Sequence, residues 1–137
     1  MTEPTPAKPL PTITDENRPF WDGCAKGELR MQECSSCGHV RYPIQSLCPR
    51  CLAAEFTWRT LSGRGEVFAQ AVYHRAFHPA YTADVPYNLV LVQLAEGPRM
   101  YSNVVDGDVH VGDRLTVVFD EVADGIHLPR FRRDQED

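Results

Sequence analysis

The chain has 137 residues, with 14 Lys or Arg against 19 Asp or Glu and a formal net charge of −5 at pH 7. This length supports a single hydrophobic core, so we expect one domain, or two small modules that share a core. The acidic balance argues against a protein that holds nucleic acid by neutralising phosphates, and no run of about 18 apolar residues predicts a membrane span.

The N-terminal segment is rich in proline, with four prolines among its first eleven residues. Proline lacks an N–H donor and favours extended backbone, so we expect residues 1–13 to form a flexible arm outside the core. The segment contains no apolar stretch of the kind found in secretion signals. We therefore expect a soluble, cytoplasmic protein.

Residues 14–28 predict a short N-terminal helix that runs from about Asp15 to Lys26. Thr14 or Asp15 can cap its start, Pro19 is tolerated only in its first turn, and Gly27 can end it. A helix of two to three turns is marginal in water unless it packs on something. Its aromatic side chains, Phe20 and Trp21, either dock on the core of this chain or contact another chain.

Residues 29–55 predict a zinc ribbon. They contain two CxxC pairs separated by ten residues, Cys34 with Cys37 and Cys48 with Cys51. Each pair can place two thiolates on one side of a tight turn, and two such turns bring four sulfurs around one Zn²⁺. Disulfides are disfavoured in a cytoplasmic chain, and a redox CxxC does not need a second pair. Four thiolates leave no open coordination position, so the predicted metal is structural.

The two cysteine turns differ in one residue. Gly38 directly follows Cys37 and supplies permissive backbone, whereas Leu52 stands where a second glycine would be expected. This difference predicts a less regular second turn. The fifth cysteine, Cys24, is predicted to be an ordinary half-buried residue of the helix.

Residues 56–133 have β character throughout. Alternating or continuously apolar segments predict strands at 66–75, 88–95, 100–105, 114–122 and 126–132. Asp124-Gly125 predicts a hairpin between the last two strands. Five or six short strands without intervening helices are typical of a small barrel, so we predict a mainly β protein whose C-terminal part is an OB-fold.

We predict no catalytic residue in this chain. None of the five histidines lies in a nucleophile motif, and no Ser or free Cys has a recognisable elbow around it. His74, His78 and Asp84 border or lie within the long irregular segment between two strands, so a free-standing hydrolase that uses His74 or His78 is an alternative. The segment also carries Phe77, Tyr81 and Tyr87, which favour a contact surface or a cavity lid.

Twelve of the fourteen basic residues are arginine. Genomic base composition accounts for such a bias without any function. Arg130, Arg132 and Arg133 nevertheless lie close together in the last predicted strand, where guanidinium groups could hold phosphates or carboxylates of a partner.

Seven motifs in a fixed order carry a family resemblance. They are PFW (19–21), GELRMQECSSCGHVRYP (27–43), CPRC (48–51), SGRGEV (62–67), VPYNLVLVQLAEG (85–97), VGDRLTVVF (111–119) and LPRF (128–131). From about residue 15 to 133 the chain resembles the acyl-CoA-associated family known as domain of unknown function 35 (DUF35). This family combines an N-terminal helix, a rubredoxin-like zinc ribbon and an OB-fold.

The resemblance implies a noncatalytic accessory subunit of an enzyme that acts on acyl-CoA. The implied partner is a thiolase-like subunit of the lipid-transfer-protein type, in a heterotetramer, with a hydratase as a further partner. The implied reaction is that of a steroid side-chain aldolase, which cleaves a β-hydroxyacyl-CoA. Acyl-CoA would be a ligand or substrate that the subunits share. The residues expected to contact the partner or the acyl-CoA are Phe20, Trp21, Phe77, Tyr81, Tyr87, Arg130, Arg132 and Arg133.

Other functions remain open from the sequence. Relatives are also accessory to acyltransferases, to hydroxymethylglutaryl-CoA formation and to hydratases. A zinc ribbon followed by an OB-fold also occurs in modules that bind single-stranded nucleic acid, but these need a positive groove with stacking aromatics. The net charge of this chain has the wrong sign for that role.

Overall fold

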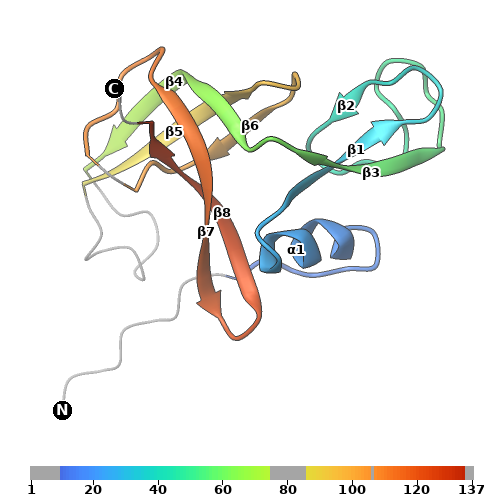
Figure 1. Ribbon diagram of the computed structural model, residues 1–137, viewed down its shortest axis with the longest axis horizontal. Coiled ribbons are helices and arrows are strands. Elements are labelled where there is room, and N and C mark those ends of the chain that lie inside the picture. Colours follow the sequence, from blue (N-terminus) through green and yellow to red (C-terminus); the bar gives the residue numbers. More distant parts are fainter. Residues whose placement is uncertain (1–9, 75–85, 106, 135–137) are drawn as a thin grey trace.

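The computed structural model describes residues 10–74, 86–105 and 107–134, which form one short helix and two antiparallel sheets (Figure 1). The elements are α1 (Arg18–Ala25), β1 (Leu29–Cys34), β2 (Val40–Arg41), β3 (Phe56–Leu61), β4 (Arg64–Tyr73), β5 (Tyr87–Leu94), β6 (Arg99–Ser102), β7 (Arg114–Ala123) and β8 (Ile126–Arg133). The mainly β fold is confirmed. No helix in these ranges has the length and apolar character needed to cross a membrane.

Helix α1 begins later than the sequence predicts. Pro19 sits in its first turn, which places the start at Arg18 and makes Asn17 the N-cap. Thr14 and Asn17 instead close a turn before the helix, because the Thr14 N–H donates to Asn17 Oδ1 at 2.7 Å. After the helix, Gly27 adopts a φ of +78°, the left-handed conformation that favours glycine.

The first sheet has the strand order β2-β1-β3 and forms the ribbon (Figure 1). All six residues of β1 pair with β3, from Leu29 opposite Leu61 to Cys34 opposite Phe56. Strand β2 contributes only two residues. Strand β3 therefore lies beyond the predicted end of the ribbon at residue 55 but belongs to the sheet of the ribbon.

The second sheet has the order β6-β5-β4-β7-β8 and curls into a half-barrel that is consistent with an OB-fold, as predicted. The five strands predicted between residues 66 and 132 are all present, as β4 to β8. A register shift between Val67 and Ala69 marks a bulge in β4, which helps the sheet to bend. A parallel bridge between Val104 and Phe131 brings the chain after β6 beside β8.

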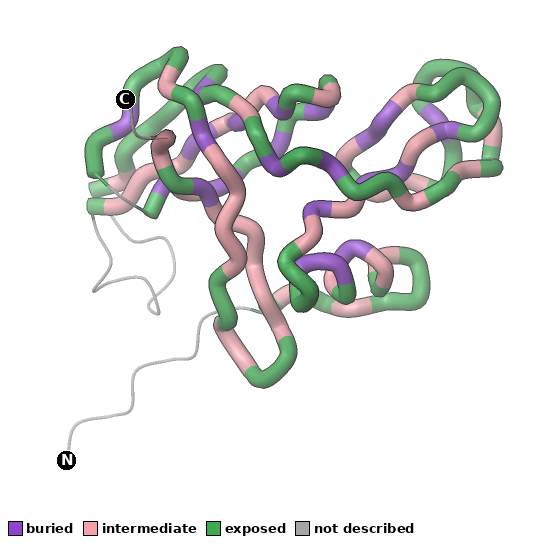
Figure 2. Tube along the Cα trace, viewed as in Figure 1, coloured by how far each residue is buried: buried purple, intermediate pink, exposed green. Residues whose placement is uncertain are grey.

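One hydrophobic core runs through both sheets. Helix α1 lies between the ribbon and the β7–β8 hairpin, and its buried face supplies Phe20 and Cys24 to this core (Figures 1 and 2). Met31 from the ribbon, and Val92 and Phe131 from the second sheet, belong to the same cluster. The helix therefore joins the two sheets.

Candidate functional site

The four cysteines predicted to bind a metal meet at one end of the ribbon. Cys34 ends β1, Cys37 lies in the turn that follows, and Cys48 and Cys51 lie in the second turn, before β3. Their sulfur atoms all lie within 4.8 Å of one another. The Sγ atoms of Cys34 and Cys51 are 3.5 Å apart, and those of Cys37 and Cys48 are 3.7 Å apart. Tetrahedral zinc with sulfur ligands requires about 3.8 Å between sulfurs, so the cysteines are positioned for this ion.

The two cysteine turns have matching backbones. The Gly38 N–H donates to the Cys34 carbonyl at 2.9 Å, and the Leu52 N–H donates to the Cys48 carbonyl at 2.8 Å. Gly38 has a φ of +78° and Leu52 a φ of +65°, so both residues are left-handed. The prediction of a less regular second turn was wrong, because Leu52 adopts the conformation of the missing glycine.

The turns also favour thiolates at two of the four positions. The Cys37 N–H, directed at the Cys34 sulfur at 3.5 Å, lowers the pKa of Cys34 to about 6. Burial opposes ionisation of Cys48, but backbone N–H groups of Cys51 and Arg50 outweigh it and lower its pKa. Such N–H groups favour the deprotonated sulfur that a metal requires.

The sulfur of Cys51 has the opposite tendency in the metal-free chain. The Ala53 N–H favours its thiolate, yet the neighbouring sulfur of Cys34, burial, and the sulfurs of Cys37 and Cys48 together raise the pKa of Cys51 to about 12. The Sγ atoms of Cys34 and Cys51, and those of Cys37 and Cys48, are close enough for a hydrogen bond through a thiol proton. Bound zinc would take the place of those protons and hold all four sulfurs as thiolates.

A buried arginine, which the sequence did not reveal, supports the second cysteine turn. Arg41 is 2% exposed and lies next to Gln32, which is fully buried. Its Nε donates to Gln32 Oε1 at 3.1 Å, and its Nη2 donates to the Gln45 carbonyl at 3.0 Å. The Gln45 N–H in turn donates to Gln32 Oε1 at 2.9 Å, and the guanidinium lies 4.9 Å from the centre of the Phe56 ring. This network fastens the chain that leads to Cys48 onto the sheet.

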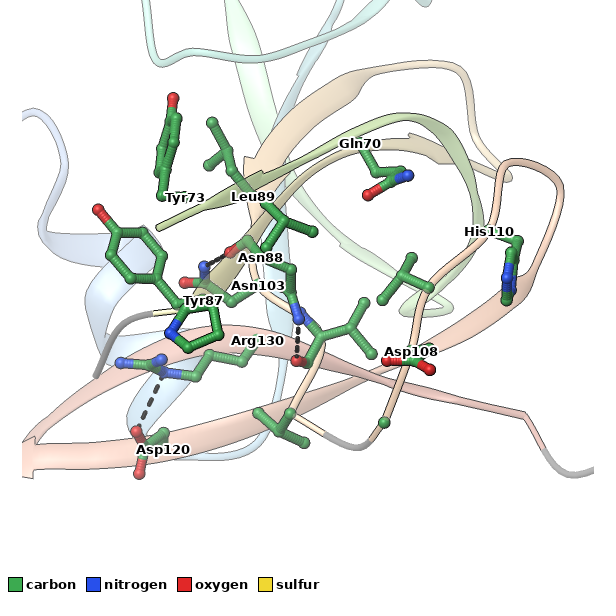
Figure 3. A pocket seen from close by; sticks show the side chains of 16 residues that line it. Gln70, Tyr73, Tyr87, Asn88, Leu89, Asn103, Asp108, His110, Asp120 and Arg130 are labelled. Carbon is green, nitrogen blue, oxygen red and sulfur yellow. Dashed lines mark hydrogen bonds and ion pairs between the residues drawn. The ribbon is translucent and has the colours of Figure 1, made fainter. Parts of the chain in front are cut away.

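The second sheet lines an open cavity of about 920 Å³, shown in Figure 3. Its lining comes from β4, β5, β7, β8 and the chain after β6. Asn88 fixes one wall, because its Nδ2 donates to the Val104 carbonyl at 2.8 Å and its Oδ1 accepts from the Val104 N–H at 2.7 Å. Arg130 and Asp120 form an ion pair with 3.0 Å between Nε and Oδ2.

The described lining of this cavity offers little for covalent chemistry. It includes no Ser, Thr, Cys or Lys; its acidic and basic residues are Asp108, Asp120 and Arg130, and it also includes His110. His110 lies 3.7 Å from Asp113 on an exposed turn. Elsewhere His74 is exposed and His127 lies 3.4 Å from Glu121, while His78 and Asp84 fall outside the described residues. No acid–base pair with a nucleophile is assembled in this part of the chain.

The predicted contact residues are spread over the molecule. Tyr87 lines the cavity and packs edge-on against Tyr73, with 5.3 Å between ring centres. Phe77 and Tyr81 lie outside the described residues. Phe20 is only 3% exposed, so its ring belongs to the core of this chain and has no surface to offer a partner. Trp21 is half-buried and packs edge-on against Phe20 at 4.9 Å.

The three arginines of β8 do not form one cluster. Side chains alternate along a strand, so Arg133 lies on the face of β8 opposite to Arg130 and Arg132. Arg130 is engaged by Asp120, and Arg132 lies 4.0 Å from Asp134. Their roles toward phosphates or a partner stay predictions. Cys24, expected to be half-buried, is 1% exposed, and burial raises the pKa of its thiol to about 12.

Two family models match the chain in succession. The model for the ChsH2 rubredoxin-like zinc ribbon domain matches residues 21–57, and the model for the ChsH2 C-terminal OB-fold domain matches residues 58–120. The boundary between the two models falls inside β3, so most of this strand is matched by the OB-fold model although it pairs in the sheet of the ribbon. Together the models span residues 21–120, from α1 into β7, and leave β8 outside.

Three known proteins are similar to this chain over much of its length. A DUF35 domain-containing scaffold protein of Methanocaldococcus jannaschii is 33% identical over 66% of this chain and 67% of its own length. A probable enoyl-CoA hydratase alpha subunit of Thermomonospora curvata is 30% identical over 95% of this chain, which spans 41% of that protein. A solved structure described as Ltp2-ChsH2(DUF35) aldolase is 28% identical, with a TM-score of 0.80 over 90% of this chain and 98% of the matched chain.

Proposed function

This chain belongs to the DUF35 family, and from that premise we propose that it is a noncatalytic accessory subunit of a heteromeric enzyme acting on acyl-CoA. The observation that carries the proposal is the match to the aldolase structure, because this chain spans 98% of the matched chain in a protein named for two components, Ltp2 and ChsH2. The partner would be a thiolase-superfamily subunit of the Ltp2 type that holds the reacting groups.

The chemistry of the chain supports a structural role. Four cysteine thiolates would fill the tetrahedral positions of a zinc ion and leave none open for water or substrate. The described lining of the cavity also lacks Ser, Thr, Cys and Lys. We therefore assign the zinc ion to the stability of the ribbon and the reaction to the partner.

The reaction that we favour is cleavage of a β-hydroxyacyl-CoA of the steroid side-chain type. In such a retro-aldol reaction a base removes the hydroxyl proton, the bond between Cα and Cβ breaks, and Cβ becomes the carbonyl carbon of one product. The electron pair of the broken bond passes to Cα as an enolate, which takes up a proton to give the shorter acyl-CoA. The cavity beside Tyr87 and Arg130 would help to shape or extend the acyl-CoA site of the partner. Trp21 and Arg132 remain further candidates for contact with the partner.

A hydratase complex is the second candidate. The relative from Thermomonospora curvata is described as a hydratase alpha subunit, and this chain matches 41% of it. In that case the chain would serve a partner that adds water to an enoyl-CoA. The two candidates share the same accessory role and differ in the partner.

Coexpression with a thiolase-superfamily subunit and, separately, with a hydratase subunit tests the proposal. We expect the chain to copurify with one of them and to raise its activity or its yield of folded protein, and we expect the isolated chain to turn over neither substrate. The readouts are the size of the complex and the rates of β-hydroxyacyl-CoA cleavage and enoyl-CoA hydration. Turnover of either substrate by the isolated chain would contradict the proposal. So would the absence of a complex with either subunit, if both subunits were also as active and as well folded without this chain as with it.

A further inference from the structure

The outward face of the second sheet carries one apolar row, where a solvent-exposed antiparallel sheet is usually polar, beside a polar row of Glu66, Gln93 and Arg99. Ala69 of β4, Leu91 of β5 and Tyr101 of β6 lie opposite one another across the three strands, so their side chains share this face. The alternate residues Val90 and Met100 are buried on the inner face. Tyr101 is 66% exposed.

An exposed arginine stacks on an exposed ring beside this row. The guanidinium carbon of Arg99 lies 3.8 Å from the centre of the Phe68 ring, which is 47% exposed. The Arg99 Nε donates to Gln93 Oε1 at 2.7 Å. No ion pair joins Arg99 to a carboxylate within residues 10–74, 86–105 and 107–134, although Glu66 lies in the same row of this face, beyond Gln93.

We call these five residues the outer patch: Phe68, Ala69, Leu91, Arg99 and Tyr101. Their composition is that of the centre of a protein interface, where aromatic residues and Arg are enriched and Lys, Asp and Glu are depleted. Strand β5 agrees with this, because its apolar run is typical of a strand covered on both faces. Among the described residues of β5, the buried ones lie on the inner face, and Leu91 on the outer face is only partly buried.

We propose that the outer patch docks against the enzyme subunit of the complex, through an apolar area of that subunit that lies beside a carboxylate. This inference rests on the proposed function. The carboxylate would pair with Arg99, and the apolar area would cover Tyr101 and Phe68. Glu66 lies in the neighbouring row of the same face, opposite Gln93 and in line with Arg99, so the charge of the patch does not by itself exclude a second copy. The similar solved structure is named for two different components, Ltp2 and ChsH2, which favours a different protein. A different protein is therefore the occupant to which we commit.

Two substitutions test the patch against a thiolase-superfamily subunit of the Ltp2 type. Tyr101→Ala removes an exposed anchor, and Arg99→Glu reverses the charge that would face the carboxylate. Each should weaken the binding constant at least about 10-fold, as expected for central aromatic and arginine residues of an interface. Val111→Ser is the matched control, because Val111 is 67% exposed but lies on a turn outside the patch. Its affinity should stay within about 2-fold of the wild type.

The outcomes separate this inference from the function on which it rests. Zinc content and melting temperature equal to those of the wild type would show that the variants are folded. If the wild type binds the subunit and both variants bind equally well, the patch is not the interface and the accessory role stands. If the wild type does not bind, the thiolase-type partner fails, and the patch proposal fails with it. If light scattering finds a wild-type dimer that Tyr101→Ala separates, a second copy occupies the patch and the proposal is overturned.

Discussion

Leu52 shows how one residue can satisfy a backbone requirement at a cost in strain. Its φ of +65° is a conformation that leucine disfavours, and its side chain is 71% exposed, so little packing offsets the strain. Glycine would relieve a penalty of roughly 1–2 kcal/mol but would also gain freedom in the unfolded chain. We expect Leu52→Gly to raise the free energy of unfolding by roughly 0.5–1 kcal/mol.

Thermal unfolding of the zinc-loaded protein measures this change. Leu47→Gly is the matched control, because Leu47 is 49% exposed in the same loop region and is not left-handed. It should leave stability unchanged or lower it slightly. A lower melting temperature for Leu52→Gly would mean that its side chain stabilises the turn after all.

At the scale of residues, the sequence predicted groups whose spacing is fixed by chemistry. The positions of Cys34 and Cys48 follow from the CxxC spacing alone, because the turn geometry is local. The burial of Arg41 could not be predicted in this way, since charged residues are rarely buried and its partners, Gln32 and Gln45, are brought to it by the sheet. The outer patch was missed for a similar reason, since Phe68 and Arg99 meet across three strands.

The ribbon is the element whose stability depends most on the metal. Strand β2 has only two residues, so the sheet of the ribbon is small, whereas zinc-finger peptides gain about 10–16 kcal/mol from their ion. We expect one zinc ion per chain in protein purified without chelators. Removing it with a chelator, or replacing Cys34 with serine, should unfold at least the β1–β3 sheet.

Metal analysis together with circular dichroism or amide spectra of β1 and β3 measures this outcome. Cys24→Ala is the matched control, because Cys24 belongs to α1 and lies outside the group of four sulfurs. It should keep its zinc even if it loses some stability. Freshly purified protein without stoichiometric zinc would refute the structural metal.

At the scale of elements, local sequence signals predicted the turns and the bounds of the helix, but they did not predict which strands pair. The Asp124-Gly125 turn identified the β7–β8 hairpin, and Pro19 together with Gly27 bounded the helix to within a few residues. The place of β3 could not be predicted, because its residues have the same β character as the strands that follow. Its pairing with β1 is set by the two cysteine turns, which return the chain beside Cys34.

The whole molecule depends on α1, because this helix lies where the two sheets come together (Figure 1). Phe20 packs against Trp21 at 4.9 Å and Tyr42 at 6.2 Å between ring centres, and it belongs to the same buried cluster as Phe131 of β8. Sequence alone left two roles open for this ring, core or partner contact. The position of the helix in the structure favours the core, since the ring is 3% exposed.

Phe20→Ala distinguishes these two roles. Truncating a buried phenylalanine costs about 3–5 kcal/mol, so we expect the melting temperature of the zinc-loaded chain to fall by about 10 °C or more. Because one core spans both sheets, the unfolding should remain a single transition. Tyr101→Ala, at a ring that is 66% exposed, should shift the melting temperature by no more than about 2 °C. If Phe20→Ala instead keeps the wild-type melting temperature and weakens only the binding of the partner subunit, Phe20 is an interface residue and the helix does not join the two sheets as described.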